Sequence, residues 1–415
     1  MTSRYASLTR DDLAVLVPEL LLIGQLIDRS GMAWCISAFG REEMAQIAIE
    51  EWAGASPIYT RRMQRALGYA PAVPGEGDIV DIFKGLQLDI GAPPQFMDFR
   101  YEVKDRWHGE FRLDRCGALL DVEPLGPDYV RAMCHDIEDP TFDATAVATN
   151  PRAQVRPIHR PPRVPADRNP HCAWTVIIDP AHTPVSPLPP YYAIEATRAA
   201  TVELDPIVAG GEGADDYSGP LLSDLDFTRF SHSALVRIAD EVCVQMHLLN
   251  LSYVLAVRKR ARDAEQAEEI CRKQLVGLAG IAARRIRDAL ALGADEAAAM
   301  RAIELHPLLN PVAYTGGVVD GTTLRVTPSD ASADGAWIAL CGPGDPVRAQ
   351  ALHAIVREID PHFDVDIDGT DDDWTAHLAR RAEPAAESSE VAVTAFSGGT
   401  TFEFEHRAPL PLFVV

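Results

Sequence analysis

The chain has 415 residues, which at roughly 100–200 residues per domain predicts two to four domains. Its 47% hydrophobic and 24% charged residues are typical of a globular protein that buries a sizeable core. The 38 basic and 61 acidic residues give a net charge of −23. Repulsion from phosphate groups therefore argues against binding to nucleic acid or to an anionic membrane surface.

The sequence contains no candidate for a membrane span or a disulfide framework. Its most apolar stretch, from Leu13 to Ile27, includes Pro18 and Glu19 and is too short to cross a bilayer. This stretch lacks the basic start and the cleavage site of a signal peptide. The 7 cysteines are spread over the whole chain, unlike those of a small disulfide-rich domain. We therefore expect a cytoplasmic protein with free thiols.

The first part of the chain is predicted to begin with helices and to continue with strands. Met44, Ile47, Ala48 and Trp52 recur at the spacing of one helical face, whereas residues 110–116 alternate with the period of two that is typical of strands. The predicted helices cover 11–28, 41–67, 78–88, 127–136 and 139–148, and the predicted strands cover 101–105, 110–116, 154–158 and 173–178. The last helix is expected to begin anew at Asp139-Pro140, an N-cap followed by proline.

A proline-rich connection follows. Eleven of the 40 residues from 151 to 190 are proline, and several glycines come after them, so we expect few regular elements there. Beyond this connection the predicted helices cover 235–246, 263–292 and 345–359, and the predicted strands cover 322–327, 336–341, 365–367, 390–396 and 401–405.

The two parts resemble each other as an internal duplication would. Residues 39–50 align without a gap with residues 230–241, and Asp128-Tyr-Val-Arg-Ala aligns with Asp345-Pro-Val-Arg-Ala. We therefore predict an α+β fold of two similar halves, each with helices packed on a short, mainly antiparallel sheet. The expected divisions are a domain over 1–180, a linker over 181–222 and a second domain, a degenerate repeat, over 223–415.

Residues able to do chemistry are concentrated in the first half. The cluster consists of Cys116, Cys134, His135, Asp136, Glu138, Asp143, His159, His171 and Cys172. The second half has no counterpart, because Ala351 aligns with Cys134 and Ala333 with Cys116. We therefore expect the chemistry to belong to the first half.

Three interpretations of this cluster are open. In the first, Cys134 or Cys172 is a nucleophile whose pKa is lowered by nearby cations. His171 and His135 would then move protons, and Asp136 or Glu138 would orient an imidazole or act as a base. In the second, a metal such as zinc or iron is bound by Cys116, Cys134, His171 and Cys172. In the third, these are packed core thiols and structural histidines, since cysteine is among the most buried residue types.

The segment from Arg156 to Arg168 is a basic exception in an acidic chain. Arginine side chains bind carboxylates and phosphates through two parallel hydrogen bonds, so Arg156, Arg160 and Arg163 are candidates to bind a small anionic molecule, with Trp174 beside them. The alternative is a loop whose arginines pair with acids of the chain itself.

The first half also resembles a known family. Phe111-Arg-Leu-Asp-Arg-Cys116, Leu125-Gly, Cys134, Asn150-Pro151 and Cys172 before a strand are similar to the motifs of the L-2-amino-thiazoline-4-carboxylic acid hydrolase-like family. The resemblance covers roughly residues 39–179. It implies hydrolytic opening of a small sulfur–nitrogen heterocycle that carries a carboxylate, with the three cysteines at the matching positions.

The leading hypothesis is a hydrolase that acts on a C–N bond of a small carboxylate-bearing substrate. The alternative is a non-catalytic protein that holds a metal or a small ligand with the same Cys/His cluster. Neither the substrate nor the metal follows from the sequence. A homodimer is plausible only because symmetric dimers are common among soluble enzymes.

Overall fold

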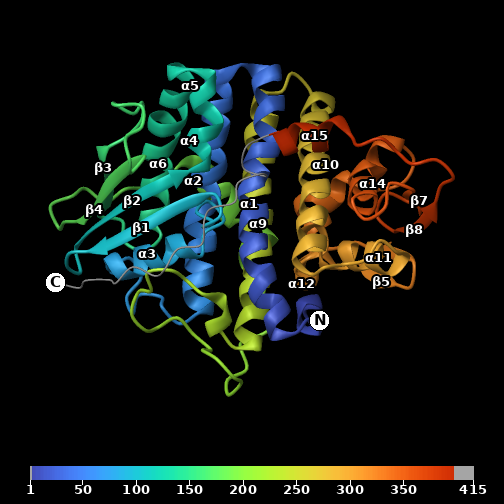
Figure 1. The fold of residues 1–415 in the computed structure, drawn as a ribbon, viewed down its shortest axis with the longest axis horizontal. Coiled ribbons are helices and arrows are strands. Elements are labelled where there is room, and N and C mark those ends of the chain that lie inside the picture. Colours follow the sequence, from blue (N-terminus) through green and yellow to red (C-terminus); the bar gives the residue numbers. More distant parts are fainter. Residues whose placement is uncertain (1, 397–415) are drawn as a thin grey trace.

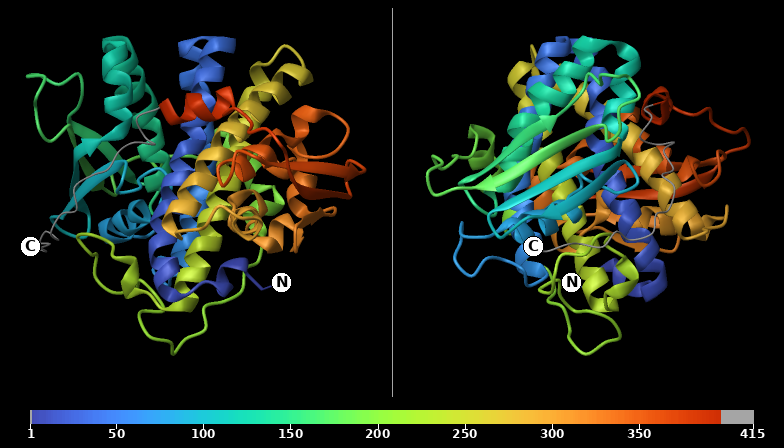
Figure 2. Two further views of the ribbon diagram at one scale, coloured as in Figure 1. Left: turned by 45° about the vertical axis from the view of Figure 1, so that its right-hand side comes forward. Right: turned by 60° about the vertical axis from the view of Figure 1, so that its left-hand side comes forward.

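The computed structural model describes residues 2–396 of the chain. Four long helices form its centre: α1 (Arg10–Phe39), α2 (Arg41–Ala66), α9 (His232–Arg260) and α10 (Ala264–Ala289). One sheet lies on the α2 side of these helices and a second sheet lies on the α10 side (Figure 1). Figure 2 shows the same arrangement from two other directions.

The central helices begin where the sequence supplies a cap. The Thr9 side chain accepts a hydrogen bond from the backbone of Asp12, and the Asp12 carboxylate accepts one from Thr9 in return. Ser231 caps α9 and Asp263 caps α10 through side-chain oxygens. Gly40, with a φ of 85°, makes the turn between α1 and α2.

The two sheets share one strand order. In the first, β1 (Met97–Val103), β2 (His108–Cys116), β4 (Cys172–Ile178) and β3 (Ala153–His159) lie side by side. In the second, the same order is formed by β5 (Val318–Asp320), β6 (Thr323–Val326), β8 (Trp374–Arg380) and β7 (Phe363–Gly369). All neighbouring strands are antiparallel. The predicted α+β fold of two similar halves is therefore confirmed.

Shorter helical elements connect the strands to the centre. They are η1 (Arg4–Ser7), α3 (Ile79–Gln87), α4 (Gly117–Val122), η2 (Glu123–Leu125), α5 (Pro127–Arg131), the π-helical segment η3 (Ala132–Ile137), α6 (Glu138–Val147), α7 (Pro189–Glu195), α8 (Arg198–Thr201), η4 (Phe227–Arg229), α11 (Glu296–Leu305), η5 (Pro307–Leu309), α12 (Val312–Thr315), α13 (Asp330–Asp334), η6 (Trp337–Leu340), η7 (Pro346–Ala349), α14 (Gln350–Arg357) and α15 (Ser389–Phe396).

The central helices correspond in pairs, α1 with α9 and α2 with α10. Aligning their first residues pairs Glu19 with Glu241 and Arg62 with Arg285. The structure uses these four residues reciprocally. Arg62 Nε donates to Glu241 Oε2 at 2.9 Å, and Arg285 Nε donates to Glu19 Oε2 at 2.5 Å. Two equivalent arginine–glutamate pairs thus connect the halves across the centre.

The similarity of the halves extends into the segment predicted to be a linker. The backbone N–H of Val185 donates to the carbonyl of Pro151, and that of Ala385 donates to the carbonyl of Pro361, both at 2.8 Å. Shortly after each contact, α7 packs on α2 and α15 packs on α10. We therefore use "first half" for α1 through α7 and "second half" for α9 through α15.

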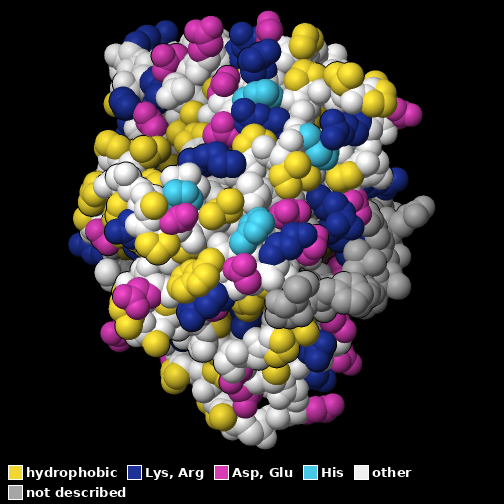
Figure 3. Space-filling model, turned by 90° about the vertical axis from the view of Figure 1, so that its left-hand side faces the viewer, with side chains coloured by type: hydrophobic (Ala, Val, Ile, Leu, Met, Phe, Trp, Pro, Cys, Tyr) yellow, Lys and Arg dark blue, Asp and Glu magenta, His cyan; other side chains and the backbone are white. Residues whose placement is uncertain are grey.

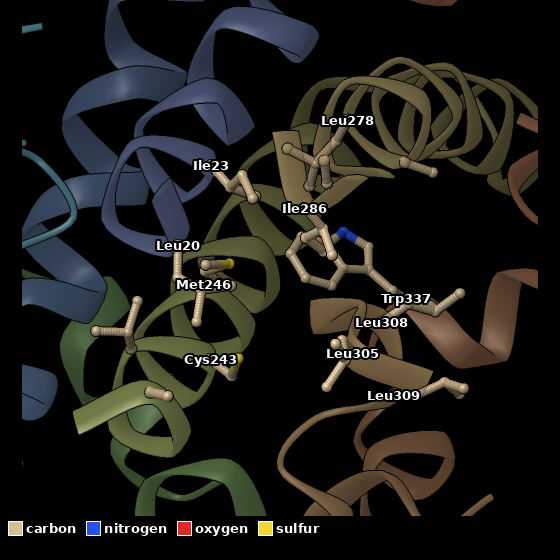
Figure 4. Close-up of a cluster of buried hydrophobic side chains, with 14 of the residues drawn as sticks. Leu20, Ile23, Cys243, Met246, Leu278, Ile286, Leu305, Leu308, Leu309 and Trp337 are labelled. Atoms are coloured by element: carbon tan, nitrogen blue, oxygen red, sulfur yellow. The ribbon is translucent and has the colours of Figure 1, made fainter. Parts of the chain in front are cut away.

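One hydrophobic core joins the halves. It includes Leu20 and Ile23 of α1, Val242 and Met246 of α9, and Leu278 of α10. Figure 4 shows side chains from these helices meeting at the centre. None of the helices in the described part of the chain combines the length and apolar character needed to span a membrane.

Several local predictions were wrong. Residues 39–50 cross from α1 into α2, whereas residues 230–241 lead into α9, so that alignment is displaced by one helix although the two halves are similar. Residues 336–341, predicted as a strand, contain η6, and residues 390–396, also predicted as a strand, form α15. The side chains of α15 fit the close approach allowed by Gly277 and Gly280 on α10, so tertiary packing overrides β-propensity.

Other differences concern single elements. β5, β8 and α11 were not predicted, and α6 runs on directly from η3 without a new start at Asp139-Pro140. The strand predicted over 401–405 lies outside the described residues.

Candidate functional site

A pocket opens in the first half between the central helices and the sheet. One wall is the face of η3 and α6 on which Met133, Ile137, Glu138 and Phe142 recur at helical spacing. Its cavity has a volume of about 90 Å³, which is below the roughly 300–1,000 Å³ of pockets for drug-sized ligands and leaves room only for a very small molecule. We call it the acid pocket, and its lining is Gln25, Asp28, Arg29, Trp52, Leu86, Asp89, Gly91, Ala92, Met97, Phe99, Ala118, Met133, Ile137, Glu138, Thr141, Phe142 and Thr145.

Glu138, the first residue of α6, brings a buried carboxyl group to this pocket. The residue is 8% exposed, and its Oε2 atom has no hydrogen-bond partner among residues 2–396. Burial raises the pKa of this carboxyl to about 8, against the opposing effect of Arg160. The π-helical segment that precedes it is of a kind found frequently at functional sites. Glu138 is therefore largely protonated at neutral pH and able to donate a proton.

Asp89 lines the same pocket but is held differently. Its Oδ1 atom accepts hydrogen bonds from the Tyr59 hydroxyl at 2.9 Å and from the backbone N–H of Gly91 at 2.7 Å. Burial raises the pKa of Asp89 to about 6, and these two hydrogen bonds limit the rise. At neutral pH Asp89 is therefore mostly ionised while Glu138 is mostly protonated.

Arg29 provides a buried positive charge in the pocket. Its Nη1 atom lies 3.4 Å from Asp121 Oδ2, and its guanidinium lies over the Phe96 ring at 5.4 Å. The Nε atom has no hydrogen-bond partner in the described structure. A buried guanidinium with an N–H group still to be satisfied is suited to bind a carboxylate.

Two further carboxyl groups are buried near Arg29. Asp28 is 5% exposed and lines the pocket, whereas Glu51 is 1% exposed and lies in the core. Burial raises the pKa of Asp28, and burial together with the nearby Asp28 raises the pKa of Glu51 well above its ordinary value. The Oε1 atom of Glu51 makes no hydrogen bond to any described residue. The first half therefore contains carboxyl groups that cost stability wherever they are ionised.

The three cysteines of the predicted cluster lie close together, behind the pocket wall. Cys172 is the residue opposite Leu113 across β2 and β4, and Cys116 Sγ donates to Met97 Sδ at 3.6 Å. Cys134 lies in η3, close enough to both other cysteines for them to raise the pKa of its thiol. Met97 lines the acid pocket, but none of the three cysteines does.

Burial keeps these thiols protonated. It raises the pKa of Cys116 to about 12 and those of Cys134 and Cys172 well above the ordinary value, and the nearby Glu138 raises all three further. Because the thiolate is the nucleophile, the thiols are poorly placed to attack a substrate. Their surroundings match those of packed core cysteines.

The other predicted catalytic residues do not line the pocket. The ring of His135 contacts the carbonyl of Pro161 through Nε2 at 2.6 Å, and Asp136 is exposed. Burial lowers the pKa of His171, which keeps its imidazole neutral. Trp174 is fully buried in the core of the sheet.

The predicted anion-binding arginines pair with acids of the chain itself. Arg156 contacts Asp143 at 2.9 Å, Arg163 contacts Glu123 at 2.7 Å, and Arg160 contacts Asp139. The side of the molecule that carries the first sheet shows basic and acidic side chains interspersed (Figure 3). The structure therefore matches the alternative of an ion-paired loop.

The predicted metal ligands do not form a coordination site. Across residues 2–396, no group of three or more His, Cys, Asp and Glu side chains is arranged to hold a metal ion. Cys116, Cys134, His171 and Cys172 thus do not converge as a ligand set for zinc or iron.

The second half replaces the ionisable groups at the equivalent positions. Aligning the starts of the central helices pairs Asp28 with Asn250, Glu51 with Gln274, Arg29 with Leu251 and Trp52 with Leu275. The Nδ2 group of Asn250 donates to Gln274 Oε1 at 3.2 Å. Two buried acids in one half are therefore represented in the other half by two neutral amides joined by a hydrogen bond, although Asn250 Oδ1 has no partner among the described residues.

A tryptophan fills the corresponding space in the second half. The Trp337 side chain is fully buried, and its Nε1 lies 3.5 Å from Gln274 Oε1. Its ring lies 5.1 Å from that of His247, the counterpart of Gln25. Figure 4 shows the Trp337 side chain among the buried hydrophobic side chains.

Sequence reasoning missed most of the acid pocket. Asp28 and Arg29 directly follow the apolar stretch that ends at Ile27, and Glu51 lies beside the apolar stripe of α2. Charged residues within the buried face of a helix were the available signal, because charged side chains are almost never fully buried unless they are paired.

Comparisons of the chain with protein-family models, with curated proteins and with solved structures give no match. Interpretation of the site therefore depends on its geometry and on the contrast between the halves.

Proposed function

We propose that the protein is a hydrolase acting on a C–N bond of a small, carboxylate-bearing molecule in the acid pocket. The observation that supports this most is the pair Glu138 and Asp89. Both line one pocket, yet burial moves the pKa of one to about 8 and that of the other to about 6. Two carboxyl groups separated in this way can act as acid and base at the same pH.

In the proposed step, Asp89 takes a proton from a water molecule while the oxygen of that water bonds to the substrate carbon. Glu138 gives its proton to the departing nitrogen as the C–N bond breaks. The products are an oxygen-bearing carbon fragment and an amine, and the enzyme is left with Asp89 protonated and Glu138 ionised. Proton exchange with solvent restores the starting state.

Arg29 is the proposed binding group for the substrate carboxylate. Its Nε–H has no hydrogen-bond partner in residues 2–396, so binding of a carboxylate would satisfy a buried donor. The role that the sequence suggested for Arg156, Arg160 and Arg163 passes to Arg29 in this proposal. The choice of a C–N bond and of a carboxylate in the substrate comes from the family resemblance of the first half.

The proposal assigns acid–base catalysis to carboxyl groups and leaves the thiols in a packing role. Cys134 and Cys172 lie close enough to Glu138 for this carboxyl to raise the pKa of both thiols, and burial raises the pKa of Glu138 itself.

The direct test is a hydrolysis assay that detects amine or ammonia released from small linear and cyclic C–N compounds with and without a carboxylate. We expect turnover of a carboxylated member, with a bell-shaped pH dependence of kcat/KM limited near pH 6 and pH 8. Glu138→Gln should lower kcat by at least about 100-fold, whereas Cys134→Ala should retain most activity.

Full activity of Glu138→Gln would contradict the proposal, and loss of activity in Cys134→Ala with a normal fold would favour a thiol nucleophile. Binding of these compounds without any turnover would favour the alternative of a non-catalytic ligand-binding protein.

A further inference from the structure

A second pocket lies at the end of α2, where Arg61 and Arg65 face a wall of apolar residues. The volume of this pocket is about 450 Å³. We call it the arginine pocket, and its lining is Arg61, Gln64, Arg65, Ala70, Pro71, Ala72, Pro74, Gly75, Val147, Ala148, Pro151, Val185 and Pro187. It shares no lining residue with the acid pocket.

The guanidinium of Arg61 has no carboxylate partner in the described structure. Its Nε donates to the carbonyl of Ala148 at 3.1 Å, and its Nη1 donates to the Tyr191 hydroxyl at 2.9 Å. Its Nη2 donates to no group in residues 2–396, and neither Arg61 nor Arg65 forms an ion pair within that range. No acidic residue lines this pocket, although the chain has a net charge of −23.

The second half contains an equivalent pocket of about 390 Å³, in which the arginine already pairs with acids of the chain. Arg284, which aligns with Arg61, donates to Glu358 through Nε at 2.9 Å and through Nη2 at 3.0 Å. It also donates to Glu387 at 2.8 Å. Both acids line this pocket.

The first half lacks both of these acids at the matching positions. β3 and β7 begin two residues after Pro151 and Pro361 respectively, so Ala148 corresponds to Glu358. The matching backbone contacts of Val185 and Ala385 make Pro187 the counterpart of Glu387. The same arginine therefore has two internal carboxylates in one half and none in the other.

We propose that the arginine pocket is a binding site for a small carboxylate with an apolar body. The ligand's carboxylate would take the place that Glu358 and Glu387 occupy around Arg284, and its apolar part would lie against the prolines and Val147. Arg61 offers Nη2, and Arg65 adds a second positive charge at the same wall. Arginine is suited to this role because its fork binds carboxylates in a fixed geometry.

The test is isothermal titration of the full-length protein with hexanoate. Hexanol, which has a similar hydrocarbon chain but no charge, is the control ligand. We expect hexanoate to bind with one-to-one stoichiometry and at least ten times more tightly than hexanol. Arg61→Ala should weaken hexanoate binding at least tenfold.

A pair of substitutions keeps the test decisive if Arg61→Ala fails to fold. Pro187→Glu and Ala148→Glu each supply an acid that the second half already carries, so each should abolish hexanoate binding while leaving a folded protein. Pro187→Gln, which is similar in size but neutral, should retain binding.

Equal binding of hexanol and hexanoate, or hexanoate binding that persists in Pro187→Glu, would overturn the proposal. So would the absence of hexanoate binding by the unsubstituted protein. The assay measures binding and not turnover, so its outcome is independent of the hydrolytic role proposed for Glu138.

Discussion

The two halves share one plan, yet they differ in what they bury. In the first half the central helices enclose the acid pocket with Asp28 and Arg29 at its wall, whereas the second half has Asn250 and Leu251 at these positions and fills the space with Trp337. Both halves keep the strand order and the reciprocal ion pairs. The shared features therefore hold the molecule together, and the differing ones set the buried acids of the first half apart from the residues that replace them in the second.

The same contrast separates stability from function. Buried acids without partners destabilise a fold when they are ionised, whereas neutral amides carry no buried charge. The second half has neutral amides where the first half retains Asp28 and Glu51 at a cost, although it too buries an acid, Asp240, whose pKa burial raises to about 7. Such local cost is expected at functional sites.

The largest effect is expected from emptying the filled half. Trp337→Ala removes a fully buried indole and should lower the free energy of unfolding by about 4 kcal/mol, because the cavity cannot collapse fully. Trp52→Leu, which introduces the residue found in the second half, should cost less than about 1.5 kcal/mol because Trp52 lines an existing pocket. Urea unfolding of both variants measures the decrease in the free energy of unfolding. Equal decreases would contradict the proposed difference between the two halves.

A smaller effect is expected from the reciprocal ion pairs. Glu241 is 1% exposed and receives both Arg62 and Arg237, so Glu241→Ala should cost about 3 kcal/mol by leaving buried guanidinium groups uncompensated. The side chains of Glu19 and Arg285 are 22% and 19% exposed, so Glu19→Ala should cost only about 1 kcal/mol. Denaturant titration of each variant decides this, and the reverse order of the two losses would show that the ion pairs are not graded by burial.

The smallest effect has the opposite sign. Asp28→Asn combined with Glu51→Gln gives the first half the amides of the second half, and we expect a gain of about 2 kcal/mol at neutral pH. Because burial raises the pKa of both acids, each favours its protonated form when folded. The wild type therefore loses stability as pH rises above the ordinary pKa of these acids. Thermal unfolding should show the gain at pH 8 and little gain at pH 4, and a gain independent of pH would refute this explanation.

The sequence predicted the architecture better than the site. Helical periodicity sufficed for α2 and α10, whereas the short match at Asp128 and Asp345 was out of register with the alignment of β3 and β7 that pairs Ala148 with Glu358. Period-two alternation failed for η6 and α15, because short apolar runs fit a strand and a buried helical turn equally well.

For the site, the sequence identified Glu138 and the clustering of three cysteines, but not the chemistry of either. Whether a thiol is reactive depends on its pKa, and burial sets that pKa only once the chain has folded. Asp89 and Arg29 lie far from Glu138 in sequence, so only the packing of α1, α3 and α6 reveals that they share a pocket with it.

The central claim is that the first half holds Glu138 protonated at neutral pH. Infrared difference spectroscopy between the wild type and Glu138→Gln isolates the carboxylic acid C=O band of this residue, and its intensity can be followed from pH 4 to pH 10. We predict a band that persists at neutral pH and disappears with a midpoint near pH 8. A midpoint near the ordinary glutamate pKa of about 4.3 would contradict the account.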